Sequence, residues 1–303
     1  FQVKKLVACL FLIIVFCAFN SVVSAQNNEQ LFLEQEIKGL KSDSDRVNFL
    51  NKKGEDFLND GNFKDALSYL NKALKIATEH KFDTKIITIY QNIGNVYSDE
   101  GNNQEAIKYY NIALGICKKL NNRKGVSQTL NLIGIAAQNQ GNYKDALKYF
   151  EQALEINLSL NNKADVLKNY TNIGNLYSDQ GNNSKALPNF EASLRIAREL
   201  KDNKSISRNL NNISTCYFIK GFYAEALNYL LESLKINESI GNKGQIADNY
   251  LNIGIIYYYQ ENYDEALKCQ LKSLAINRVL AKKRDIAYNL TNISSIYFEL
   301  KKY

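Results

Sequence analysis

Asparagine recurs along this chain at a fixed interval, and its side chain offers clear recognition chemistry. Asparagine is abundant in the 303 residues, and five copies occupy the same place in different units of an internal repeat. A carboxamide carries a hydrogen-bond donor and an acceptor together, so it can pair with a peptide group without reading the neighbouring side chain. The chemistry of the row therefore suits contact with the backbone of an extended polypeptide. Its members are Asn92, Asn172, Asn212, Asn252 and Asn292.

A structural role for these asparagines is the alternative, because an inward-facing carboxamide can also bond a neighbouring helix. A companion row three residues upstream fits that structural role better than it fits ligand contact. The companion row consists of Asn169, Asn209, Asn249 and Asn289.

An aromatic row lies six residues after the asparagine row. The early units carry Leu, Ser or Gln there, and the last three carry Phe218, Tyr258 and Phe298. Five hydrogen bonds at about 1 kcal/mol each give on the order of 5 kcal/mol, whereas micromolar binding needs about 8. Aromatic anchors are therefore expected to supply the rest. The alternative is that these rings pack against whatever follows Tyr303.

Catalytic chemistry finds no support in the residue pattern. His80 is the only histidine, no glycine loop has phosphate-binding spacing, and no cysteine and histidine cluster could bind a metal. Acidic pairs such as Asp99 and Glu100 flank turns, where solvent covers them. We expect no enzyme, no cofactor and no metal site.

The elements that position these rows are helices in an internal repeat. Six units of equal length run over 47–86, 87–126, 127–166, 167–206, 207–246 and 247–286, and a seventh begins at Ala287. In the second unit, Tyr90, Ile93, Gly94 and Tyr97 draw one helical stripe. A second stripe spans 106–116, after the breaker "GNN" at 101–103. Each unit is thus predicted to be a helix, a tight turn and a second helix, which makes the chain all-α.

Small residues recur on both predicted helices, where they would let the two helices cross closely. The first helix carries Gly54, Gly94, Gly134, Gly174, Ser214, Gly254 and Ser294. The second carries Ala66, Ala106, Ala146, Ala186, Ala226 and Ala266.

This pattern resembles the tetratricopeptide repeat family, whose small, aromatic and alanine positions are matched by Gly94, Tyr97, Ala106 and Ala113. The resemblance covers 47–303. It departs from the usual repeat of about 34 residues, because the period here is 40 and no proline closes the unit. In this it looks like the long-repeat branch known from kinesin light chains and from cell-polarity and bacterial regulatory scaffolds.

The resemblance implies an α-solenoid, a right-handed superhelix of antiparallel helix pairs whose first helices line a concave groove. The asparagine row holds the sixth position of the first helix and the aromatic row the twelfth, and both are groove positions in the family. In several long members of the family, asparagines at the sixth position bind the backbone of an extended peptide.

The N-terminus precedes the repeats and has the pattern of an export signal. Residues 1–25 join a basic start to an uninterrupted apolar run and an Ala-type cleavage site, so we expect a signal peptide and a periplasmic or other extracytoplasmic location in a bacterium. An uncleaved membrane anchor is the alternative. Residues 26–46 are predicted to form a capping helix.

The charge of the chain is mild. Removing Lys4 and Lys5 with the signal lowers the net charge from +7 to +5, and the basic residues that remain are interspersed with acidic ones. This dispersed balance does not favour nucleic acid as a partner.

The leading functional hypothesis is a non-enzymatic scaffold that binds a protein or peptide segment in the groove. A second hypothesis makes the repeats the sensory or dimerisation region of a bacterial signalling protein, such as a sensor histidine kinase or cyclase, with its output domain beyond residue 303. A homodimer and a membrane link through the missing C-terminal segment would then be expected. A third is a structural spacer without a ligand.

Overall fold

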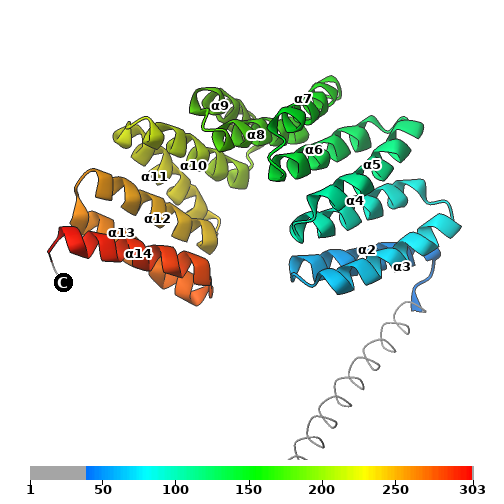
Figure 1. Cartoon of the computed structure of the whole chain (residues 1–303), viewed down its shortest axis with the longest axis horizontal. Helices are drawn as coiled ribbons and strands as arrows, with labels where there is room; N and C mark the ends of the chain where they lie inside the picture. Colours follow the sequence, from blue (N-terminus) through cyan, green and yellow to red (C-terminus); the bar gives the residue numbers. More distant parts are fainter. Residues whose placement is uncertain (1–38, 302–303) are drawn as a thin grey trace, which may run out of the picture. The chain divides into compact units, whose positions relative to one another are not determined.

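The computed structural model of the protein describes residues 39–301, and every regular element within them is an α-helix (Figure 1). The prediction of an all-α chain is therefore confirmed. The predicted signal segment, 1–25, and residues 26–38 of the predicted capping helix lie outside the described residues. The helices are α2 (Asp43–Asn59), α3 (Phe63–Glu79), α4 (Asp83–Asp99), α5 (Asn103–Lys119), α6 (Arg123–Asn139), α7 (Tyr143–Ser159), α8 (Lys163–Asp179), α9 (Asn183–Leu200), α10 (Asn203–Ile219), α11 (Tyr223–Ser239), α12 (Lys243–Tyr259), α13 (Tyr263–Val279) and α14 (Lys283–Glu299).

The chain forms two compact units that divide within α5, between Ile116 and Cys117. In the first unit, α2 packs against α3, and α3 packs against α4. In the second unit, α6 pairs with α7, α8 with α9, α10 with α11 and α12 with α13, and each second helix also packs against the next first helix. Each unit is thus a stack of helical hairpins in chain order.

Short turns end the helices at the predicted glycines. Gly61, Gly101, Gly141, Gly181 and Gly221 have positive φ angles of 70–89°, a conformation in which a side chain would be strained. Asparagines after several of these turns cap the next helix: Asn62, for example, accepts a hydrogen bond from the backbone of Asp65. Part of the asparagine content of the chain therefore serves its turns.

The small residues on the first helices face a large side chain on the second. A Cβ added at Gly174 would lie 2.6 Å from the ring of Phe190, and one at Gly94 would lie 2.3 Å from the ring of Tyr110. The alanine column, from Ala66 to Ala266, is fully buried. Close crossing of the helices thus depends on glycine making room for a ring, with the alanines buried beside it.

The first hairpin begins at Asp43, where the side chain of Ser42 caps α2. The predicted start of the first repeat, residue 47, therefore falls inside α2, because the repeat boundaries were drawn from the sequence period and not from the turns. No helix among residues 39–301 is long and apolar enough to cross a membrane.

Candidate functional site

Three cavities follow the first helices of the second unit, and each brings together one residue of the predicted asparagine row and one twelfth-position residue of the preceding repeat. Their volumes are 270, 200 and 260 Å³ in chain order. The pairs are Ser178 with Asn212, Phe218 with Asn252, and Tyr258 with Asn292.

Neighbouring cavities share lining residues: Thr215 lines those of 270 and 200 Å³, and Ile255 lines those of 200 and 260 Å³. We call the latter two, which contain Phe218 and Tyr258 of the aromatic row, the aromatic groove. Its lining residues are Ser214, Thr215, Phe218, Leu230, Asn252, Gly254, Ile255, Ile256, Tyr258, Tyr259, Gln270, Asn292, Ser295 and Ile296. No acidic or basic side chain is among them. The third, which we call the polar cavity, is lined by Gln138, Asn175, Ser178, Asp179, Phe190, Asn212 and Thr215.

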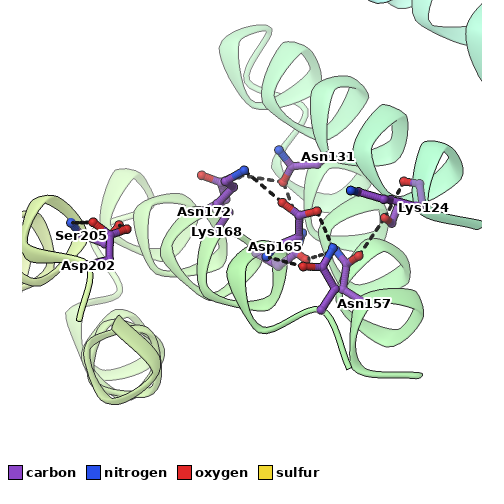
Figure 2. A network of polar contacts seen from close by, with 11 residues as sticks. Lys124, Asn131, Asn157, Asp165, Lys168, Asn172, Asp202 and Ser205 are labelled. Carbon is purple, nitrogen blue, oxygen red and sulfur yellow. Dashed lines mark hydrogen bonds and ion pairs between the residues drawn. The ribbon is translucent and has the colours of Figure 1, made fainter. Parts of the chain in front are cut away.

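Three asparagines of the predicted row bond to the preceding repeat. The amide nitrogen of Asn92 donates to Asn51 Oδ1 at 3.0 Å and to Glu55 Oε1 at 2.8 Å. Asn172 donates to Asn131 Oδ1 at 2.8 Å, as Figure 2 shows.

The third member, Asn212, donates to Asn175 Oδ1 at 3.3 Å. These three carboxamides therefore contribute to packing between repeats, as the structural alternative expected. Only Asn212 among them also lines a cavity described above.

The other two members, Asn252 and Asn292, form no hydrogen bond through their side chains within residues 39–301. The cause lies at two positions of the preceding repeat, which correspond to Asn51 and Glu55 as seen from Asn92. For Asn292 these positions hold Leu251 and Ile255, which have no polar side-chain atom.

For Asn252 the two corresponding positions are polar, but neither side chain bonds to Asn252 and both bond to other groups. Asn211 Oδ1 accepts from Asn249 at 3.1 Å, and the Thr215 hydroxyl donates to the backbone of its own helix at 3.1 Å. Asn252 and Asn292 thus present unused donors and acceptors in the two cavities of the aromatic groove.

The predicted aromatic row also meets this groove, and it gathers further rings. Phe218 contacts Tyr259 edge-to-face with ring centroids 5.1 Å apart, and Tyr223 at 5.6 Å. Tyr258 contacts Tyr259 and Tyr263 at 5.9 and 5.6 Å.

Phe298, the last member of the aromatic row, is 65% exposed on α14 and lines neither cavity. Sequence reasoning missed Tyr259, which is 56% exposed and belongs to the groove. The signal was the run "YYY" at 257–259, which is longer than the repeat pattern requires.

The companion row has a structural role at the junctions between repeats. Asn169, Asn249 and Asn289 are buried, and each accepts a hydrogen bond from an asparagine 12 residues upstream, at 2.7, 2.8 and 3.0 Å. The fourth member, Asn209, instead donates to Ser193 Oγ at 2.9 Å.

The upstream partners, Asn157, Asn237 and Asn277, were missed by sequence reasoning. Their signal was present in the repeat: the same column holds Ala77, Cys117 and Ala197 in the other units. The change from a small apolar residue to asparagine marks the junctions that are polar.

The described residues offer little that could act in catalysis. Within 39–301, no group of three His, Cys, Asp or Glu side chains could hold a metal ion. Cys117, Cys216 and Cys269 are free and buried, and burial raises the pKa of each thiol, which keeps it in the unreactive protonated form. On α12, burial raises the pKa of the Asp248 carboxyl, and the nearby Lys282 opposes that shift.

Stacked helical hairpins with a first-helix groove define a class of repeat scaffold, and comparison with known proteins identifies the family. The family model of the tetratricopeptide repeat matches residues 45–119, 85–159, 165–239 and 245–303. The chain belongs to the tetratricopeptide repeat family. No curated protein matches this sequence.

Solved structures with the same fold include two proteins in complex with a ligand and a signal transduction ATPase. A Rap protein complexed with competence and sporulation factor is 20% identical with a TM-score of 0.62, over 85% of this chain and 72% of that one. NprR in complex with its cognate peptide NprX is 17% identical with a TM-score of 0.60, over 93% and 81%. A signal transduction ATPase with a tetratricopeptide repeat sensor, from Pyrococcus horikoshii, is 17% identical with a TM-score of 0.65, over 86% and 42%. At these identities the likeness shows the fold.

Proposed function

We propose that this protein is a non-enzymatic interaction scaffold that binds an extended segment of another protein in the aromatic groove. The observation that carries the proposal is the pair of unbonded carboxamides, Asn252 and Asn292, each beside a ring of the aromatic row. Polar groups with unused hydrogen-bonding capacity next to half-buried rings are a common composition of protein-binding surfaces. The Rap and NprR structures are named as complexes with a factor and with a cognate peptide, which agrees with this use of the fold.

The proposal narrows the predicted ligand site from the whole asparagine row to the members of the row in the C-terminal repeats. Asn92 and Asn172 are occupied within the scaffold, so we assign them to packing between repeats. Asn212 lines the polar cavity and forms only a 3.3 Å bond, so it can extend the ligand site by one repeat.

Selection of random linear peptides displayed on phage, with the full chain as bait, tests the proposal. Selected peptides are expected to lose about tenfold or more in affinity for Phe218→Leu combined with Tyr258→Leu, which removes two anchoring rings but keeps apolar volume. Leu158→Ala is the control, because Leu158 is an exposed apolar residue on α7 outside the groove. Circular dichroism would verify the fold of each variant. Peptides that bind the double variant and wild type equally would contradict the proposal.

A signalling input region is the second candidate, and it would use the same groove. The similar ATPase is named for its repeat sensor, which favours keeping this candidate. A signalling input region, unlike a simple scaffold, is expected to form a homodimer when its ligand binds. Light scattering should then show a doubling of mass when a selected peptide is added, and a constant monomer mass would contradict the dimer.

The location proposed for this scaffold is extracytoplasmic, on the basis of the signal pattern in residues 1–25. Expression in a bacterium followed by mass spectrometry of the product measures the cleavage directly. A product that begins at Gln26 supports export, and an intact N-terminus in the cytoplasmic fraction contradicts it.

A further inference from the structure

The aromatic groove has a composition that selects among extended ligands. We propose that it binds an uncharged, proline-rich segment in the polyproline II conformation. This inference rests on the proposed function, and it names the chemical class of the bound segment.

The charge of the groove excludes acidic and basic ligand motifs. Its lining contains amide, hydroxyl, aliphatic and aromatic groups, with no carboxylate, ammonium or guanidinium to pair with a ligand charge. A charged side chain entering it would lose hydration without gaining a partner. The polar cavity differs, because Asp179 lines it and accepts a hydrogen bond from Gln138 at 2.6 Å.

The rings are arranged to hold flat apolar groups. Phe218 and Tyr259 meet at an interplanar angle of 77°, and Tyr258 and Tyr259 meet at 84°. Rings that stand nearly perpendicular to one another form corners that compact, rigid pyrrolidine rings can fill. Aromatic-lined grooves are the general solution for polyproline II recognition, because the ligand is already extended before it binds and loses little entropy.

The free carboxamides match what such a ligand can offer. A polyproline II segment has no internal hydrogen bonds, and its prolines have carbonyl acceptors but no N–H donors. The amide nitrogens of Asn252 and Asn292 can each donate to one of these carbonyls. The carboxamide oxygens of Asn252 and Asn292 can in turn accept from the N–H groups of non-proline residues in such a segment.

Fluorescence anisotropy with the full chain and two labelled, uncharged peptides of equal length tests the inference. One peptide repeats Pro-Pro-Ala and the other repeats Leu-Ser-Ala. The proline peptide is expected to bind at least about tenfold more tightly. Equal affinity for both, or binding of the proline-free peptide alone, would overturn the inference.

Isosteric substitutions test the donor role without changing the shape of the groove. Asn252→Asp and Asn292→Asp each replace an amide donor with a carboxylate. Each variant should bind the proline peptide about fivefold or more weakly than the wild type. Gln152→Glu, the same change at an exposed site on α7, should leave the affinity unchanged. Retention of full affinity by the two groove variants would refute the assignment.

The two proposals can fail separately. Library-selected peptides that depend on Phe218 and Tyr258 but lack proline would leave the proposed function standing and refute the polyproline assignment. Failure of every peptide to depend on these rings would remove both.

Discussion

At the scale of single residues, glycines decide how closely the two helices of a hairpin approach. Gly134, Gly174 and Gly94 each face an aromatic ring of the paired helix, and Gly54 faces Leu70. A methyl group at these positions would overlap the facing side chain, whose own position is fixed by burial. The hairpin therefore depends on the absence of a side chain at one point of its first helix.

Gly174→Ala should lower the free energy of unfolding by about 1–3 kcal/mol, because the new Cβ would lie 2.6 Å from the Phe190 ring. Gly115→Ala is the matched control, since Gly115 is helical and has no neighbour within 4 Å of its Cβ position. That control should be stabilising by roughly 0.5–1 kcal/mol. Urea denaturation measures both, and a neutral Gly174→Ala would show that the ring can move aside.

Single residues also show how far sequence reasoning reaches. The asparagine and aromatic rows were found from the period and assigned to a groove through the family resemblance, and the structure places Phe218, Tyr258, Asn212, Asn252 and Asn292 in cavities. Which asparagines remain unbonded could not be predicted from the row itself. That outcome depends on the acceptors of the preceding repeat, and a recurring column in one helix carries no information about them.

At the scale of helices, buried asparagine pairs join one hairpin to the next. In the second unit they connect α7 with α8, α11 with α12, and α13 with α14. The pairs differ in whether the oxygen of the upstream asparagine has a hydrogen-bond donor. Asn157 Oδ1 accepts from the Ser127 hydroxyl at 2.8 Å, whereas Asn237 Oδ1 and Asn277 Oδ1 have no hydrogen-bond partner. A buried polar atom without a partner lowers stability by about 1–3 kcal/mol.

Ala247→Ser should repair one of these junctions. Residue 247 stands to Asn277 as Ser127 stands to Asn157, and we expect the new hydroxyl to donate to the unpaired Asn277 Oδ1 as Ser127 does to Asn157. Ser207, in the same column, instead donates to the backbone of Lys204 and leaves Asn237 Oδ1 unpaired, so the variant also tests which of these two arrangements forms. We expect a gain of about 1 kcal/mol in the free energy of unfolding. Ala287→Ser, in the same column but exposed on α14, should have no effect. Equal effects of the two variants would rule out the repair.

At the scale of the whole molecule, the repeats are similar as packing elements and unequal as binding elements. The helical period and the turn glycines were sufficient to predict all thirteen described helices, because each hairpin is determined by local spacing. The division between Ile116 and Cys117 was not predicted, since the period runs through it unchanged. Unbonded carboxamides and rings come together over α10–α14, so we place the function of the scaffold there.

A crystal structure of the full chain with a library-selected peptide tests the central claim most directly. The account predicts an extended peptide in the aromatic groove, with backbone carbonyls about 2.7–3.2 Å from the amide nitrogens of Asn252 and Asn292 and side chains against Phe218 and Tyr258. A peptide bound on the second helices, or in a groove position without contact to these four residues, would contradict it.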